Sequence, residues 1–291
     1  QNKDTSWMSK AICGLNGTQS SFVNWNAGGR NNISVLGYLV ASANYKKKLI
    51  KWDNDLGLAL GGIQYINKGS GESLQKTDDR IEIATSCGYK IKKNYYVSIL
   101  GSFRTQFMEG FKNGDSIRTS KFMAPGYLNL ALGIDYKPND NFSIFLSPVS
   151  TKVTFVRDEA LANAGSFGVD PAIYDAASGD LITAGKMFRG EFGAYFKFKY
   201  AKEIVKNIEM KAKLALFSNY IKEPENIDVN SEILFTFKVN SWFSASLNWN
   251  LLYDHDILIT DGNGETGPRT QFKSVLGLGV SYTVKNRETN K

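Results

Sequence analysis

Long segments in which apolar and polar residues alternate run through most of this chain and constrain its fold more than any other feature. In residues 190–200, GEFGAYFKFKY, the three phenylalanines fall on one parity and the three charged residues on the other. A period of two indicates a β-strand with one apolar and one polar face. Residues 128–134 and 208–216 repeat the pattern. A chain of such strands needs something to cover its apolar faces.

Alternation predicts about twelve strands, most of them longer than the five or six residues usual in soluble proteins. They are expected near residues 8–23, 32–45, 51–66, 80–91, 95–110, 121–137, 142–157, 186–202, 208–222, 228–239, 242–255 and 271–285. Helical periodicity is restricted to residues 158–178. The sequence therefore predicts an all-β chain that forms a single domain over residues 1–291.

The connections between these segments alternate between tight and mostly longer ones. Tight turns are expected around KKK, KKN, KPNDN, AKEIVKN and VNS, and the others around NAGGRN, KGSGESLQKTDD, KNGDSIRTS, residues 158–185, KEPEN and DGNGETGPR. Short periplasmic turns, longer extracellular loops and an even strand number are typical of outer-membrane barrels. Aromatic residues near strand ends suit the interface girdles of such barrels: Tyr95, Tyr136, Phe142, Tyr200, Tyr220, Trp242 and Tyr253.

A transmembrane, antiparallel up-and-down barrel would supply the missing core, because its apolar faces contact lipid and its polar faces line the lumen. Leu58, Leu130, Phe196, Leu214 and Phe235 are the side chains expected to contact lipid. The alternative is a water-soluble sandwich or barrel whose apolar faces meet internally. Unbroken successions of such long strands are uncommon in soluble proteins, which favours the membrane barrel.

Composition limits the remaining classes of protein. No run of 18 apolar residues occurs, which excludes membrane-spanning helices. The net charge of +7 favours anionic partners, but no nucleic-acid-binding motif accompanies it. Cys13 and Cys87 are expected to be free thiols, either buried or facing lipid, and no metal site or cofactor is predicted. The start at Gln1 fits a mature chain after removal of a signal peptide, and equally an engineered start.

The run GLNGTQSSFVNWNAGGRNNIS resembles the signature of an uncharacterised family of Bacteroidota outer-membrane barrels that carry a domain of unknown function. In that family a strand with a Gln-Ser pair, here Gln19 and Ser20, leads into an Asn-Trp-x-x-Gly-Gly turn. The matching residues of the turn are Asn24, Trp25, Gly28 and Gly29. A second resemblance involves Phe167, Gly168, Val169 and Gly193. The resemblance implies the fold and an outer-membrane location, and it leaves the activity open.

The single histidine lies between two acids in LLYDHDILITDG, at the loop end of a predicted strand. Omptin-type outer-membrane proteases use paired acids and an Asp-His couple at the extracellular rim, so Asp254, His255 and Asp256, with Asp78 and Asp79, invite comparison. The match is loose, because omptins have ten strands and a different Asp-to-His spacing. A solvated acidic loop explains these residues equally well, and the chain is not expected to be an enzyme.

Basic residues are predicted to line the lumen. The set consists of Lys197, Lys199, Lys211, Lys213, Lys238, Arg104, Arg189 and Lys273. Across the turn near residue 204, Lys199 is expected opposite Glu209 and Lys197 opposite Lys211. Two interpretations remain open for a lumen of about twelve strands: an aqueous, anion-leaning path, or inward ion pairs that fill a narrow barrel.

Residues 158–185 form the longest connection and contain apolar residues that a solvated loop does not require, among them Leu161, Phe167, Val169 and Ile173. We expect this segment to fold into the barrel mouth as a constriction, with an external cap or a partner-docking segment as alternatives. The sequence thus predicts a narrow channel for small anionic solutes in the outer membrane. The alternatives are a non-conducting scaffold subunit of a larger outer-membrane complex and, third, a rim hydrolase.

Overall fold

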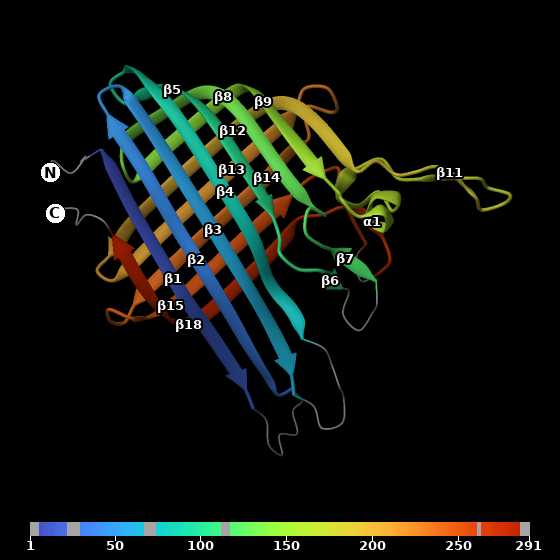
Figure 1. The fold of residues 1–291 in the computed structure, drawn as a ribbon, viewed down its shortest axis with the longest axis horizontal. Helices are drawn as coiled ribbons and strands as arrows, with labels where there is room; N and C mark the ends of the chain where they lie inside the picture. The colour runs from blue at the N-terminus through green and yellow to red at the C-terminus, as the bar shows by residue number, and fades with distance from the viewer. Residues whose placement is uncertain (1–5, 22–29, 67–73, 112–116, 261–262, 286–291) are drawn as a thin grey trace.

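The computed structural model describes residues 6–21, 30–66, 74–111, 117–260 and 263–285, and twelve of the described strands close into one antiparallel barrel (Figure 1). The barrel strands are β1 (Trp7–Ser20), β2 (Asn32–Lys47), β3 (Ile50–Tyr65), β4 (Gln75–Lys92), β5 (Tyr95–Thr105), β8 (Gly126–Asn139), β9 (Phe142–Phe155), β12 (Phe188–Val205), β13 (Ile208–Asn219), β14 (Ile227–Lys238), β15 (Phe243–Tyr253) and β18 (Gln271–Lys285). Each strand pairs with its neighbour along the chain, and β1 pairs with β18 to close the ring. The predicted all-β barrel of twelve strands is confirmed.

Tight turns and longer connections lie at opposite ends of the barrel. Residues 48–49, 93–94, 140–141, 206–207 and 239–242 make the turns at what we call the turn end, where β1 also begins and β18 finishes. The opposite, loop end carries the small elements β6 (Gly110–Phe111), β7 (Arg118–Ser120), α1 (Glu159–Asn163), η1 (Ser166–Gly168), β10 (Ile173–Tyr174), β11 (Leu181–Thr183), β16 (Leu258–Thr260) and β17 (Thr266–Pro268). The alternation predicted from the sequence is therefore present.

The three largest differences from the predicted strand boundaries are five residues each, and in one of them β5 ends at Thr105 rather than near residue 110. β4 begins at Gln75 rather than near residue 80, because the charged residues before it continue the alternation beyond the apolar part of the strand. β8 begins at Gly126 rather than near residue 121, since the segment before it forms β7 and a short irregular stretch. No helix in the described ranges is long and apolar enough to cross a bilayer.

The outer face of the barrel is apolar and exposed. Leu130 is 50% exposed and Leu276 66%, and the same parity on each strand supplies the rest of this surface. Both cysteines are free thiols and are exposed. Apolar residues of the same strands, such as Leu15 and Ile83, are exposed as well. Aromatic contacts near the turn end include Tyr95 with Tyr136, with ring centroids 4.8 Å apart. Exposing such an apolar surface to water is unfavourable, whereas exposing it to lipid is not.

The core of the barrel is a packed patch on one side of the lumen. Inward side chains of five consecutive strands, from β5 to β13, form it: Leu100, Ala131, Phe145, Tyr195 and Phe217. Close by, the inward residues Ser98 and Ser147 are almost completely buried. One wall of the lumen is therefore dry, and any water path must follow the other wall.

Candidate functional site

The basic residues predicted to line the lumen lie on the inward parity of their strands, and several reach carboxylates on distant strands. Lys199 on β12 contacts Asp55 on β3, with Nζ and Oδ2 3.0 Å apart. Lys273 on β18 contacts Asp78 on β4 at 3.1 Å. These strands are not neighbours in the ring, so the ion pairs cross the lumen.

One ion pair joins opposite walls. Arg80 on β4 contacts Glu232 on β14 at 3.2 Å, and these strands lie six places apart in the ring of twelve. Glu232 also lies 3.5 Å from Lys213, and Arg80 lies 3.8 Å from Glu82. The middle of the barrel is thus bridged by a network of opposite charges.

Several inward lysines nevertheless remain accessible to water. The side chains of Lys213, Lys238 and Lys273 are 46%, 47% and 44% exposed although they point into the barrel. By contrast, Lys152 on the dry side is 11% exposed. The lumen therefore contains water-sized space on the side of β13, β14 and β18.

The register between β12 and β13 corrects one prediction. Lys199 lies opposite Lys213, not Glu209, and Lys197 lies opposite Ala215, not Lys211. The difference arises because β12 continues to Val205 and reverses in the two residues 206–207, so the hairpin is longer than the predicted turn near residue 204 allows. Two lysines consequently face each other directly across neighbouring strands.

The other predicted lumen residues lie at three different heights. Lys211 and Lys238 share Glu209 near the turn end, at 3.3 and 3.5 Å. Arg104 packs its guanidinium over the ring of Tyr127 at 5.1 Å. Arg189 lies at the loop end, where it contacts Glu191 at 2.7 Å. The eight basic residues therefore do not form one cluster.

A second ionic cluster, centred on Lys152, lies at the loop end. Its ammonium contacts Asp228 on β14 at 2.6 Å, Asp254 just after β15 at 2.8 Å and Glu191 on β12 at 3.5 Å. Lys152 is not among the residues predicted from the sequence. The available signal was its parity on β9, which it shares with the buried residues Ser150 and Thr154.

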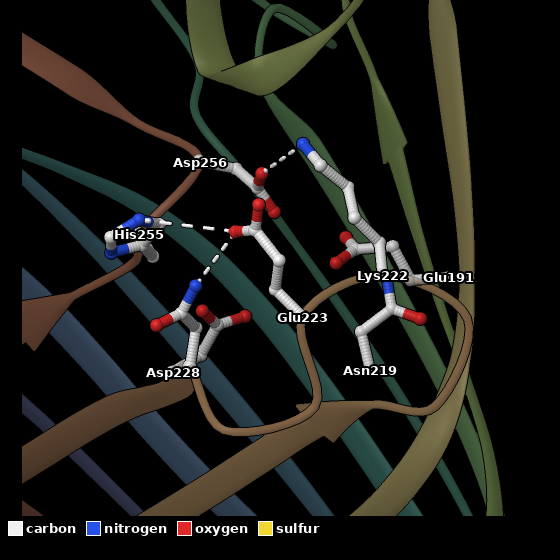
Figure 2. Close-up of a pocket in the computed structure, with 8 residues that line it drawn as sticks. Glu191, Asn219, Lys222, Glu223, Asp228, His255 and Asp256 are labelled. Atoms are coloured by element: carbon white, nitrogen blue, oxygen red, sulfur yellow. Dashed lines mark hydrogen bonds and ion pairs between the residues drawn. The ribbon is translucent and has the colours of Figure 1, made fainter.

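The acids of the rim form ion pairs with lysine and arginine side chains rather than with the histidine. Asp256 contacts Lys222 at 2.9 Å and Arg189 at 3.2 Å. Burial alone would raise the pKa of Asp256, but these two cations outweigh it and lower the pKa. His255 hydrogen-bonds through Nδ1 with the hydroxyl of Tyr253 at 3.1 Å, and its Nε2 is 4.0 Å from Glu223. Figure 2 shows Asp256, Lys222, His255 and Glu223 around a small pocket.

That pocket has about 10 Å³ of space for water, roughly what a single water molecule requires. The other two acids considered for the rim, Asp78 and Asp79, are bound elsewhere. Asp78 pairs with Lys273, and Asp79 accepts hydrogen bonds from the backbone of Phe107 and Met108. Within the described residues, no group of three or more His, Cys, Asp or Glu side chains is arranged to hold a metal ion.

The long connection of residues 158–185 divides into two parts. Its first part packs at the loop end, where Leu161, Ala162 and Val169 are buried with Val156 and Ala124. Its second part, the hairpin of β10 and β11, extends away from the barrel (Figure 1). The first part therefore packs on the loop end of the barrel, and the expected inward fold is wrong for the hairpin of β10 and β11.

Asp158 fixes the start of this segment. Its carboxylate caps α1 by accepting a hydrogen bond from the Leu161 amide, and it pairs with Arg118 at 2.7 Å and Lys121 at 2.8 Å. Burial by itself would raise the pKa of Asp158, but the hydrogen bonds from Lys121, Leu161 and Arg118 lower it to about 2. The carboxylate therefore remains charged at all but strongly acidic pH.

The residues of the two resemblances fall in different places. Asn24, Trp25, Gly28 and Gly29 lie outside the described residues. Gly168 adopts a φ of +79°, and its carbonyl accepts a hydrogen bond from Arg189 at 2.9 Å. A side chain at Gly193 would collide with the carbonyl of Ser218. The second motif thus joins the long connection closely to the barrel wall.

Two family profiles match parts of the chain, and both are described only as proteins of unknown function. Residues 18–111 match the family "Protein of unknown function (DUF3078)" and residues 185–282 match "Protein of unknown function, DUF481". Each covers about a third of the sequence. No curated protein is significantly similar to the chain.

Three solved structures illustrate the similarity of fold. An outer-membrane channel from Pseudomonas putida F1 is 10% identical, with a TM-score of 0.41 over 98% of this chain and 97% of the other. The NanC porin is 8% identical to this chain, with a TM-score of 0.39 over 93% of this chain and 98% of the porin. The translocator domain of the autotransporter NalP from Neisseria meningitidis is 9% identical, with a TM-score of 0.38 over 97% of this chain and 90% of the domain. Likenesses this distant carry no argument about activity, and the barrel assignment rests on the strand pairing itself.

Proposed function

We propose that this protein is an outer-membrane barrel that conducts small anionic solutes through the water-accessible side of its lumen. The observation that carries the proposal is the exposure of Lys213, whose side chain is 46% exposed midway along β13, together with that of Lys238 and Lys273 toward the two ends of the barrel. A charged side chain keeps that exposure only where water reaches it. The interior therefore offers space beyond its packed patch.

The charge at mid-height favours anions. Around the cross-lumen pair, the basic residues Arg80, Arg104, Lys197, Lys199 and Lys213 outnumber the acids Asp55, Glu82 and Glu232. A narrow lumen with an excess of one charge concentrates counter-ions of the other. The proposed solutes are accordingly small anions, and nucleic acid is not a proposed partner.

The outward surface supports the proposed location. Exposed apolar residues continue around the barrel, with aromatic contacts such as Trp7 with Tyr45 near the turn end. This arrangement suits a bilayer with interface girdles, so lipid is the proposed surrounding. The outer membrane of Bacteroidota, suggested by the N-terminal resemblance, belongs to the same proposal.

A second candidate is a non-conducting scaffold subunit of a larger outer-membrane complex. The contact between Arg80 and Glu232 favours it, because a pair joining opposite walls obstructs the lumen. We propose no catalytic role for the rim. Its acids are engaged by Lys152, Arg189 and Lys222, which leaves His255 without a carboxylate partner closer than 4.0 Å among the described residues.

Conductance of the purified protein in a planar bilayer separates the two candidates. We expect small, reproducible single-channel currents from the protein alone, and larger ones when residues 160–182 are deleted. Heat-modifiable migration on a gel serves as the control for folding. A folded protein that stays silent in both forms, and copurifies with a partner after gentle detergent extraction, would replace the channel by the scaffold.

A further inference from the structure

Three lysines on neighbouring strands, Lys197, Lys199 and Lys213, lie with Arg80 and Arg104 around only three acids, Asp55, Glu82 and Glu232. Lys197 and Lys199 share the inward parity of β12, and Lys199 lies directly opposite Lys213 on β13. Like charges directly opposite each other on a sheet are destabilising. A fold that retains this arrangement requires compensating negative charge.

The carboxylates nearby supply only part of that charge. Asp55 contacts Lys199 at 3.0 Å. Glu232 lies 3.5 Å from Lys213, but it also contacts Arg80 at 3.2 Å and is therefore shared. Lys199 and Lys213 thus have acidic partners, and the partner of Lys213 is shared with Arg80.

Lys197 is the lysine that lacks such a partner. Its neighbours in register are Phe145 on β9 and Ala215 on β13, neither of which is charged. Among the residues that the structure describes, no carboxylate oxygen lies within 4.0 Å of its ammonium. It belongs to the electrostatic surroundings of Lys199, Lys213, Glu82 and Asp55.

The place of Lys197 suits a small ligand. It follows Tyr195 on the inward face of β12, directly beside the apolar patch that contains Tyr195 and Phe145. Ala215 opposite it on the neighbouring strand packs against the same patch. The lysine therefore lies at the boundary between the apolar patch and the charged residues Lys199, Lys213, Glu82 and Asp55.

We propose that Lys197, Lys199 and Lys213 form a binding site for one small oxyanion, a carboxylate or phosphate group, at mid-height in the lumen. Each ammonium would donate charge-assisted hydrogen bonds to its oxygens, which are stronger than those between neutral groups. The role of this site as a stage in transport rests on the proposed channel function. Binding itself does not, and can be measured separately.

The test is thermal unfolding of the detergent-refolded protein in increasing inorganic phosphate, with sodium chloride adjusted to hold ionic strength constant. A ligand that binds the folded state raises the unfolding midpoint according to its concentration and Kd. We expect a saturable rise for the wild type. Lys197→Gln should fold, because it removes a like charge, and should weaken the apparent Kd by about tenfold or more.

Two control variants define the site. Lys197→Arg retains the charge and should bind phosphate within about threefold of the wild type, whereas Lys186→Gln, exposed beside Asp170 in the connection before β12, should leave binding unchanged. Acetate in place of phosphate distinguishes a carboxylate site from a phosphate site. A wild-type midpoint that does not rise with phosphate at constant ionic strength would overturn the proposal, and so would unaltered phosphate binding by Lys197→Gln.

The outcome is independent of conduction. Saturable phosphate binding in a barrel that never conducts would leave the site in place and reject the channel. Conduction without phosphate binding would reject the binding site and leave the proposed channel in place.

Discussion

Replacing Lys152 with Met should lower the free energy of unfolding by about 3–5 kcal/mol, the usual cost of removing one partner from a buried ionic group. Lys152 is 11% exposed and holds Asp228 and Asp254 within 2.8 Å. Its loss leaves these two carboxylates close together without their shared cation. Glu191 retains Arg189 at 2.7 Å, so the damage should centre on the two aspartates.

Urea-induced unfolding in lipid vesicles measures this effect. Lys238→Met is the matched control, because its side chain is 47% exposed and its contact with Glu209 is 3.5 Å long, so its cost should be about 0–1 kcal/mol. Adding Asp228→Asn and Asp254→Asn to Lys152→Met should recover much of the loss. Equal unfolding midpoints for Lys152→Met and the wild type would show that the cluster is hydrated rather than structural.

Replacing Phe196 with Arg should destabilise the protein in a bilayer by about 2–4 kcal/mol, the cost of Arg on the lipid face near the midplane. Phe196 lies midway along β12, in register with Leu146 on β9 and Leu216 on β13. An arginine there would have to reach the interface past apolar neighbours. Folding yield and urea-induced unfolding in vesicles report the change.

Phe188→Arg is the corresponding control at the loop end of the same strand. An arginine near the interface should cost about 0–1 kcal/mol. The difference between the two positions therefore tests both the assigned face and the depth of the strand. Equal costs for the two variants would mean that Phe196 does not face the centre of a bilayer.

The wall of the barrel could be predicted from the sequence because its determinants are local. The parity of residues such as Phe196 and Lys199 decides which face each one occupies, and turns such as Lys206 and Asn207 decide where the chain reverses. Both signals lie within a few residues. Periodicity alone could therefore indicate the strands and their apolar faces.

The contents of the lumen could not be predicted in the same way. Asp55 and Lys199 are 144 residues apart in sequence, and Arg80 and Glu232 are 152 apart. Contacts of this kind depend on strand stagger and on closure of the ring, which parity does not specify. An error of a few residues in one turn also moved Lys199 from its predicted partner Glu209 to Lys213. The basic wall was therefore visible, but the pairing of its residues with acids across the lumen and the position of Lys199 opposite Lys213 were not.

The reversal potential of the wild-type protein in a planar bilayer under a potassium chloride gradient is the most direct measurement of an anion-leaning channel. We predict a chloride preference when both solutions are near 0.1 M, where the Debye length is about 10 Å, and a much weaker one near 1 M, where it is about 3 Å. Lys213, Lys238 and Lys273 would supply the field that salt screens. A cation preference, or no current even after removal of residues 160–182, would contradict the proposed function.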